Sequence, residues 1–358
     1  MLQVFKRLLK AAARHRPGGP ARRADAARVR QCVEDMNRLA AFAAGDATGS
    51  SAWRKYADTI RHYSKPETCE AYDALFMNFV LPNVPDFDRS HGLDFGCWLG
   101  LSTLMLARLG PASMLGVDVV KSLVQAARAF ADHLGLQQVE FRLHGGGPGA
   151  PMPVESNAVD WVLANDVFSF ANPEHHDFFV RDVARVLKPG GRFLLSDANN
   201  PRHEPTVRRL RATWPRYEYG SGGPAAPDGT YFLLRQECIR ERFPDLDDDR
   251  VKQYAQETAY RWGEQIEAYV RARLAGDTAE ASRFDPDRLR PVIHPRDGRS
   301  IGAITDPVDL MSAFRSAGLE PSIRFAYPRD PADCLEDNLR RSGRFYLLGV
   351  KAGAPHGP

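Results

Sequence analysis

The sequence predicts an α/β protein built on a mostly parallel sheet, with additional helices before the sheet and a helical insertion within it. Three observations predict this fold class. From residue 91 to residue 200, short apolar runs alternate with helical stretches, which is typical of a parallel sheet. After Asn200 the alternation stops, and apolar residues keep helical spacing between Val251 and Leu274. From residue 306 the strand and helix pattern resumes, so we expect the C-terminal part to complete the sheet.

The composition is that of an ordinary globular protein. Of the 358 residues, 43% are hydrophobic and 26% are charged, and the net charge of +3 does not demand a nucleic-acid partner. No apolar run is long enough to cross a bilayer, and no signal peptide opens the chain. The five cysteines are odd in number and lack metal-ligand spacing, which predicts a reducing compartment with neither a disulfide frame nor a zinc site. We therefore expect a cytoplasmic protein.

Residues 1–24 form a basic amphipathic segment of their own. Leucine, phenylalanine and alanine fall on one helical face and lysine and arginine on the other, with no acidic residue before Asp25. One interpretation is peripheral contact between residues 1–16 and an anionic membrane surface. A terminal helix that frays or docks on the domain is the more common case for such a pattern, and a transit segment stays open.

Residues 25–85 predict an N-terminal helical lid, with helices over 25–44 and 51–80. The second helix is rich in aromatic residues, among them Tyr63 and Tyr72. These rings suit the covering of one side of the sheet, and they also suit a lid over a cofactor pocket. Packing is the more common role of such a stripe.

Residues 86–200 form the predicted core of the sheet. It holds strands at 91–95, 113–117, 139–143, 159–164 and 192–196, and helices at 101–109, 121–134 and 174–187. The insertion spans 201–305 and should shape an acceptor pocket. The completion, 306–358, holds a helix at 307–317 and strands at 322–327 and 344–350.

The chemistry is concentrated where the first strand turns into a helix, in the segment Leu93–Gly100. Gly96 and Gly100 allow a sharp turn and close approach of a ligand to the backbone, and the following helix points free N–H groups at the same place. Asp118 ends the second strand 22 residues after Gly96 (118 − 96), where an acid can accept both hydroxyls of a ribose. The alternative for Asp118 is a simple turn acid. Together these features predict a nucleoside-binding site.

On these residues the sequence resembles the class I S-adenosylmethionine-dependent methyltransferases, in their small-molecule branch. The segment 93–100 looks like the family's first motif, Asp118 like its second-strand acid, and 159–166 like its fourth strand. The segment 187–195 is similar to the entry into the family's fifth strand. The resemblance covers about residues 90–200. It implies a Rossmann-like, seven-stranded sheet with an antiparallel last strand, and S-adenosylmethionine as the cofactor.

The resemblance also implies which residues hold the cofactor. They are Asp94, Gly96, Cys97, Trp98, Gly100, Asp118, Val119 and Asn165. Three positions depart from the family pattern. Trp98 stands where the family has its middle glycine, the loop 144–149 lacks the usual adenine-binding acid, and Phe170 stands where a histidine is common.

Methyl transfer from a sulfonium is an in-line displacement that needs positioning of the acceptor and, for many acceptors, a base. Asp197 and His203, just after the fifth strand, are the predicted catalytic residues. The remaining candidates are Asp166, His175, His176 and, in the insertion, His294. Arg208, Arg209 and Arg211 fit an anionic acceptor, but a solvated helix face explains them more simply. No metal site is expected.

We therefore expect methyl transfer to an oxygen or nitrogen of a small-molecule or glycan-type acceptor. A non-catalytic binding or scaffold protein with the same fold is the first alternative, suggested by Trp98 and the missing adenine acid. A nicotinamide-dependent oxidoreductase is the second, although the segment 187–195 and the last strand argue against it. Nucleic acid is not an expected substrate, because no basic stripe is visible.

Overall fold

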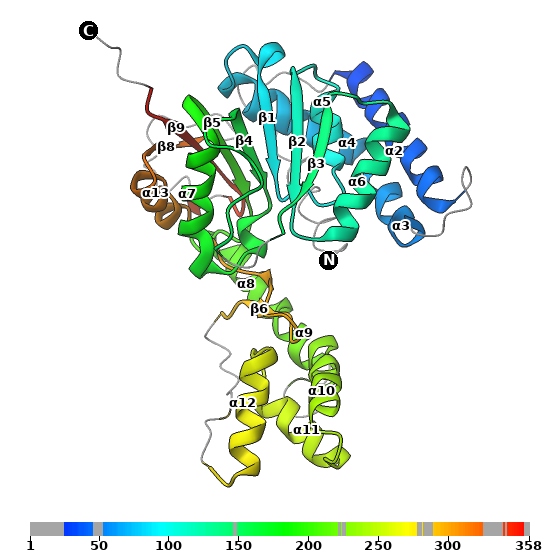
Figure 1. Cartoon of the computed structure of the whole chain (residues 1–358), viewed down its shortest axis with the longest axis vertical. Helices are drawn as coiled ribbons and strands as arrows, with labels where there is room; N and C mark the ends of the chain where they lie inside the picture. The colour runs from blue at the N-terminus through cyan, green and yellow to red at the C-terminus, as the bar shows by residue number, and fades with distance from the viewer. Residues whose placement is uncertain are drawn as a thin grey trace.

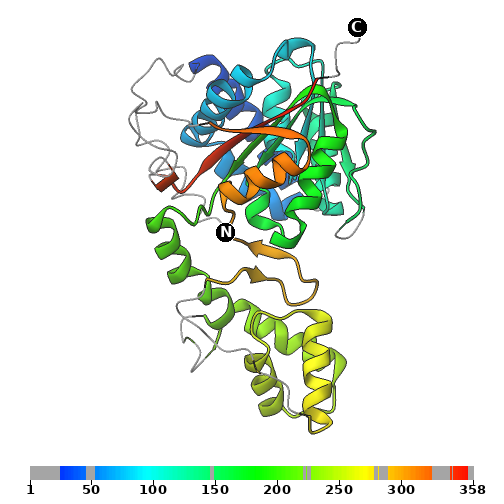
Figure 2. The same cartoon turned by 90° about the vertical axis from the view of Figure 1, so that its left-hand side faces the viewer.

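The computed structural model describes residues 25–45, 53–145, 149–220, 223, 227–277, 281, 289–324, 339–340 and 342–353. An α/β domain holds the sheet, and a helical lobe projects away from it (Figures 1 and 2). The predicted basic segment 1–24, with its proposed membrane contact through residues 1–16, lies outside the described residues.

The sheet has seven strands in the order β3-β2-β1-β4-β5-β9-β8, which confirms the predicted fold class. The strands are β1 (His91–Phe95), β2 (Ser113–Asp118), β3 (Val139–Leu143), β4 (Val159–Asn165), β5 (Leu187–Asp197), β8 (Leu319–Arg324) and β9 (Phe345–Lys351). The first five are parallel, whereas β9 runs antiparallel to both β5 and β8. Because β9 is reversed, its first residue lies at the edge where the parallel strands end.

Helices cover both faces of the sheet (Figure 1). One face carries α2 (Ala26–Ala44), α3 (Arg54–Tyr63), α4 (Pro66–Leu75), the π-helical turn η2 (Phe76–Val80), α5 (Leu101–Ala107) and α6 (Lys121–Leu134). The other carries α7 (His176–Val186) and α13 (Pro307–Ser316). Each face has its own continuous apolar core, centred on Trp161 and Phe130 on one side and on Phe193 and Phe314 on the other.

The helix predicted over 51–80 is divided into α3, α4 and η2. Pro66 is the first residue of α4, a position where its missing N–H costs nothing. Helix α3 therefore ends at Tyr63, and a new helix begins at Pro66.

The cysteine prediction was wrong in one respect. Cys32 of α2 and Cys69 of α4 form a disulfide, 37 residues apart in sequence, while Cys97 and Cys238 are free and buried. Counting cysteines could not find this bond, since only the packing of α2 against α4 brings the two together.

The insertion forms the projecting lobe. It contains α8 (Glu204–Thr213), α9 (Pro215–Tyr219), α10 (Thr230–Arg242), α11 (Asp248–Glu257) and α12 (Gly263–Leu274), with a hairpin of β6 (Val292–Ile293) and β7 (Ser300–Gly302) between lobe and domain (Figure 2). Its core is a separate apolar cluster of α10, α11 and α12 residues. A buried ion pair joins Glu218 of α9 to Arg235 of α10.

Two predicted elements are placed differently. The helical spacing over 251–274 is broken into α11 and α12, because the chain turns at Tyr260, whose φ is 62°. The strand predicted at 322–327 begins earlier, at Leu319, because the left-handed Gly318 ends α13 and directs the chain into pairing with β9.

Candidate active site

The site is built at the edge where the parallel strands end, around the turn between β1 and α5. Gly96 and Gly100 both adopt left-handed backbone conformations, with φ of 74° and 73°. A Cβ on Gly96 would lie 2.7 Å from Val167 Cγ2, and one on Gly100 would lie 2.5 Å from Phe141 Cζ. Both positions therefore require glycine, as the sequence predicted.

Trp98 lies in the same turn and also has a positive φ, of 52°. A bulky residue there is strained, so surrounding contacts must hold it. Its N–H donates to Asp118 Oδ2 at 2.9 Å, and its ring lies 5.8 Å from the ring of Tyr63. The tryptophan ring thus forms one wall of the turn, while its backbone keeps a left-handed conformation that glycine adopts more easily.

Asp118 is the acid at the end of β2, and it joins two parts of the turn. Oδ2 accepts from Trp98 N, and Oδ1 accepts from Val120 N at 2.9 Å. Burial raises the pKa of Asp118 above its usual value, against the effect of these backbone donors. The backbone of Val119 also donates to this carboxylate, so three of its four lone-pair positions are taken and one is left to accept from a ribose hydroxyl. Val119 beside it is 53% exposed and provides an apolar surface.

Asp94 and Cys97 hold this turn in place through contacts with α5 and β2. Asp94 Oδ2 accepts hydrogen bonds from Ser102 Oγ at 2.7 Å and Thr103 Oγ1 at 2.6 Å, which fixes the start of α5. Burial raises the pKa of Asp94 to about 6. Cys97 is buried, and its N–H donates to Val117 O of β2. Six predicted cofactor residues, from Asp94 to Asp118, are thereby brought together.

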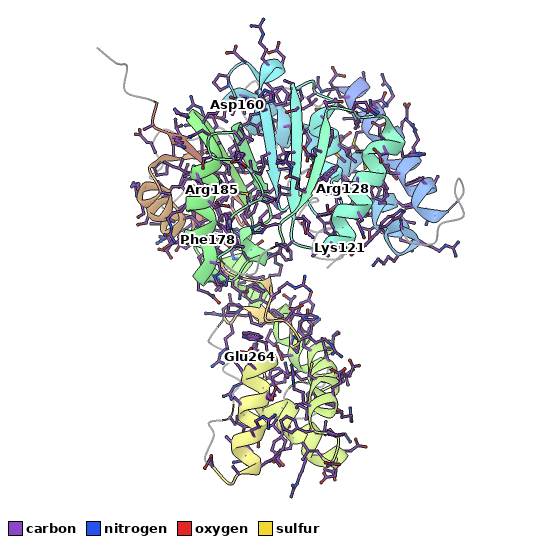
Figure 3. The ribbon with its side chains drawn as sticks, in the orientation of Figure 1. Lys121, Arg128, Asp160, Phe178, Arg185 and Glu264 are labelled. Atoms are coloured by element: carbon purple, nitrogen blue, oxygen red, sulfur yellow. A yellow bond between two sulfur atoms is a disulfide. The ribbon has the colours of Figure 1, made fainter. Side chains whose placement is uncertain are left out.

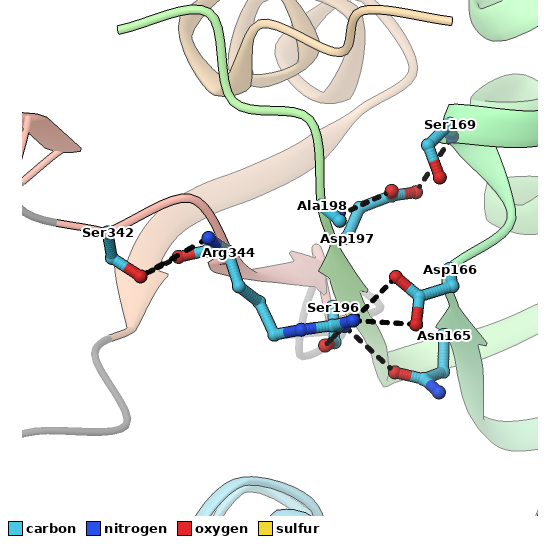
Figure 4. A network of polar contacts seen from close by, with 8 residues as sticks. All are labelled: Asn165, Asp166, Ser169, Ser196, Asp197, Ala198, Ser342 and Arg344. Atoms are coloured by element: carbon cyan, nitrogen blue, oxygen red, sulfur yellow. Dashed lines mark hydrogen bonds and ion pairs between the residues drawn. The ribbon is translucent and has the colours of Figure 1, made fainter. Parts of the chain in front are cut away.

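A network of polar contacts closes the side of the site beyond β4 (Figure 4). Arg344, directly before β9, donates to both oxygens of Asp166 at 2.7 and 2.6 Å. Its other terminal nitrogen donates to Ser196 Oγ at 2.8 Å and reaches Asn165 Oδ1 at 3.4 Å. The sequence analysis proposed Asn165 and Asp166 but did not identify Arg344. The reversed direction of the last strand was the available signal, because it places residue 344 at the site edge.

Two tyrosines of the N-terminal helices face this network. The side chains of Tyr63 and Tyr72 are hydrogen-bonded to each other, and the negative charge of Asp166 contributes to raising the pKa of both. Burial raises the pKa of both phenols, so the hydroxyls stay protonated and can donate. The helices 54–75 therefore contribute side chains to the site, in addition to packing on the sheet.

Asp197, the first predicted catalytic residue, is fully enclosed at the end of β5. Its oxygens accept from Ser169 N at 3.1 Å and Ala198 N at 2.7 Å. Burial, with a smaller effect of the charge on Asp166, raises its pKa to about 7. By strand alternation it faces the opposite side of the sheet from Ser196.

His203, the second predicted catalytic residue, precedes α8. Its Nδ1 is 2.8 Å from Thr206 Oγ1, and burial, together with Arg209, lowers its pKa, which favours the neutral imidazole. No hydrogen bond among the described residues joins His203 to Asp197.

The other histidine candidates lie elsewhere. His176 is buried, with Nε2 3.0 Å from Phe168 O, and His294 pairs with Asp297 in the hairpin. Of the arginine cluster, Arg208 is exposed and pairs weakly with Glu204, whereas the buried Nε and one terminal nitrogen of Arg209 have no partner.

The insertion is attached directly beside the site. Ala303 N donates to Ser169 O at 2.7 Å, and Ser300 N donates to Asn172 Oδ1 at 2.7 Å. Both acceptors lie in the loop that follows β4. The hairpin also brings the positive charge of Arg299 close enough to act on Asp118.

The opposite edge of the sheet holds a cleft of about 320 Å³, lined by Arg89, His91, Asp160, Lys188 and Arg192 among others. Figure 3 shows Asp160 at this edge, far from the insertion. Its carboxylate is already paired with Lys188 at 2.8 Å and with His91 N. Ligands of open parallel sheets bind at the other edge, so we do not assign the site to this cleft.

Within the described ranges, no group of histidine, cysteine, aspartate and glutamate side chains could hold a metal ion. In the same part of the chain, no helix is long and apolar enough to cross a membrane.

Comparison with known proteins identifies the domain. Residues 93–195 match a family described as "Methyltransferase domain". A demethylmenaquinone methyltransferase of Tropheryma whipplei (strain Twist) is 34% identical over 110 residues, covering 31% of this chain and 42% of that protein. A ubiquinone biosynthesis O-methyltransferase of Maricaulis maris is 33% identical over 145 residues, covering 40% and 54%. A fatty-acid O-methyltransferase of Mycolicibacterium smegmatis is 33% identical over 155 residues, covering 43% and 48%.

The chain thus spans about half the length of these relatives. Among solved structures, geranyl diphosphate C-methyltransferase from Streptomyces coelicolor A3(2) is similar with 14% identity and a TM-score of 0.41, covering 95% of this chain and 100% of that one.

Proposed function

We propose that this chain, which carries a class I S-adenosylmethionine-dependent methyltransferase domain, transfers a methyl group from that cofactor to an oxygen or nitrogen of a small-molecule or glycan-type acceptor. The observation that carries the proposal is the joining of the turn at Gly96–Gly100 to Asp118. This arrangement offers backbone groups and a carboxylate where a ribose and its substituents would lie.

The residues present suit this cofactor. Asp118 keeps an acceptor position for a ribose hydroxyl, and the Val119 side chain offers an apolar face to the adenine. When bound, S-adenosylmethionine supplies an electrophilic methyl group on its sulfonium. The chain's own contribution is to orient the two reactants and exclude water, with Trp98, Tyr63 and Tyr72 enclosing the site.

Asp197 and His203 remain our proposed proton acceptors. The raised pKa of Asp197 and the neutral state favoured for His203 are both compatible with taking up a proton near neutral pH. The enclosure of Asp197 means that the acceptor, or a relayed proton, would have to reach it past Asp166 and Ser169.

The relatives suggest the compounds to test. Their names refer to demethylmenaquinone, to O-methylation in ubiquinone biosynthesis and to O-methylation of fatty acids. We place the activity in the cytoplasm with a peripheral membrane contact through residues 1–16 as part of the same proposal. The Cys32–Cys69 disulfide argues against a reducing compartment, because disulfides persist mainly in oxidising ones. The cytoplasmic location therefore predicts that these two thiols are reduced in the cell.

The experiment is an acceptor screen. Purified protein is incubated with S-adenosylmethionine and a panel of hydroxyl, amine and carboxyl compounds, and both S-adenosylhomocysteine and methylated product are measured by mass spectrometry. With a productive acceptor, we expect S-adenosylhomocysteine and methylated product in equal amounts. If Asp197 or His203 is the base, the substitution that removes it, Asp197→Asn or His203→Gln, should lower the rate of methylation by a factor of about 10²–10⁴. A protein that binds the cofactor yet methylates nothing would instead support the scaffold alternative.

A further inference from the structure

We propose that Arg344 is a positioning residue that fixes the amide of Asn165, so that its NH2 group donates to the amino-acid carboxylate of the bound cofactor. This inference rests on the proposed function, because it assigns a role within the same site. It concerns a residue that is 179 positions away from Asn165 in sequence.

Arg344 is firmly held. Two of its hydrogen bonds go to the Asp166 carboxylate and one goes to Ser196 Oγ, all between 2.6 and 2.8 Å. Its backbone is fixed as well, since Ser342 Oγ donates to Arg344 O at 2.7 Å. The side chain is 23% exposed and that of Asp166 is 12% exposed, so the pair is largely shielded from solvent. One terminal nitrogen of the guanidinium contacts both Asp166 oxygens and the other contacts Ser196, so the group is held at both ends and has little freedom to move.

This fixed cation determines which way the Asn165 amide points. A guanidinium carries five donors and no acceptor, so the amide atom beside it must be the oxygen. The observed contact joins Arg344 to Asn165 Oδ1, at 3.4 Å. The nitrogen then points away from Arg344, as Figure 4 shows. Without Arg344, both orientations of the amide would be open.

The freed NH2 group lies beside the cofactor turn. Asp94 of β1 is paired with Leu163 of β4, and Asn165 is two residues further toward the edge, on the same face of the sheet. That places it next to the turn beginning at Gly96. A donor there can bond an oxygen of the ligand, and the methionine carboxylate is the negatively charged one that the cofactor offers.

The test is a double-mutant cycle measured by calorimetry on the full chain. S-Adenosylhomocysteine is titrated into wild type, Asn165→Ala, Arg344→Met/Asp166→Asn and the triple variant. The paired Arg344→Met/Asp166→Asn change removes both charges together, so neither is left buried and alone. Thermal unfolding of each variant checks that it is folded.

We expect Asn165→Ala to weaken binding by about tenfold in wild type, the cost of losing a hydrogen bond to a charged group. In the Arg344→Met/Asp166→Asn background, binding should already be about tenfold weaker, and adding Asn165→Ala should change it by less than about twofold. Arg344→Lys, whose head also only donates, should retain most of the affinity. Asp58→Asn, which removes one exposed carboxylate outside the site, is the matched control and should stay close to wild type.

5′-Methylthioadenosine, which lacks the amino-acid part, identifies the ligand atom. Its affinity should be the same for wild type and Asn165→Ala. An equal loss for both ligands would overturn the assignment to the carboxylate, and an equal effect of Asn165→Ala in both backgrounds would overturn the role of Arg344. Wild-type protein that binds neither S-adenosylhomocysteine nor 5′-methylthioadenosine would overturn the proposed function itself, and the role of Arg344 with it.

Discussion

Trp98 occupies a backbone conformation that glycine adopts without strain, and its contacts explain how a tryptophan is accommodated. The hydrogen bond from its N–H to Asp118 and the packing of its ring near Tyr63 offset a conformational cost on the order of 1 kcal/mol. The departure from the family pattern therefore leaves the course of the turn intact. What it changes is the wall of the site, which becomes aromatic.

Asp197 leads to a prediction about pH. Its pKa is raised from 3.8 to about 7 by burial, so the folded state holds a proton that the unfolded state releases near pH 4. This contribution to stability is fully present below pH 4 and is lost as the pH rises toward 7 and beyond. We expect the melting temperature of wild type to fall more steeply between pH 5 and pH 8 than that of Asp197→Asn, as measured by calorimetry.

The control for this prediction is Asp58→Asn, since the side chain of Asp58 is 93% exposed. It should follow wild type over the whole pH range. A melting curve of Asp197→Asn with the same pH dependence as wild type would show that Asp197 is ionised throughout.

Residue-level prediction from sequence was effective where the constraint is local. The tight turn at Gly96 and Gly100 and the strand-end position of Asp118 could be predicted, because a sharp turn and a strand end leave a mark within a few residues. Their contact with a cofactor stays a prediction. Arg344 was not found, because it reaches Asp166 across 178 residues. The reversed last strand places residue 344 at the site edge but does not indicate which side chain it pairs with. Asp197 was named for its place at a strand end, but its enclosure could not be read from sequence.

Among the elements, α2 and α4 depend on one covalent link. The Cys32–Cys69 disulfide joins them only three residues before Tyr72. We expect Cys32→Ser to lower the free energy of unfolding by about 3–4 kcal/mol, from the chain entropy of a loop of this length. Denaturant unfolding monitored by circular dichroism measures the difference.

Reductant provides the internal control for this prediction. Dithiothreitol should destabilise wild type to the level of Cys32→Ser and leave the variant unchanged. Equal stability of wild type with and without reductant would mean that the two thiols are not joined in solution.

The elements also show where periodicity is sufficient. Strands β1 to β5 were recognisable as short apolar runs between helices, whereas their order in the sheet came from the structure. The segment 251–274 kept one helical pattern, yet it forms two helices, because apolar spacing continues across a turn that only Tyr260 and Gly263 reveal. The aromatic residues of 51–80 could be interpreted as packing on the sheet or as a lid over the pocket. Only the tertiary structure places Tyr63 and Tyr72 near Asp166.

At the scale of the whole molecule, the insertion projects as a lobe, but the hairpin at its base is hydrogen-bonded to a loop of the site. Its hairpin bonds to Ser169 and Asn172, in the loop directly after β4. Anything that moves the lobe therefore acts on the loop beside Asp166 and Asp197. Sequence located the insertion through the loss of alternation after residue 200, whereas its attachment depends on contacts between segments more than 120 residues apart.

The cofactor site is the central claim, and one titration tests it most directly. S-Adenosylhomocysteine is titrated calorimetrically into wild type and Asp118→Ala, with a nicotinamide dinucleotide as the control ligand. We predict binding to wild type, weakening by about 1–3 kcal/mol in Asp118→Ala from the lost hydrogen-bond acceptor, and no binding of the nicotinamide cofactor. Folded wild-type protein that binds no S-adenosylhomocysteine would contradict the account and leave the domain as a non-catalytic scaffold.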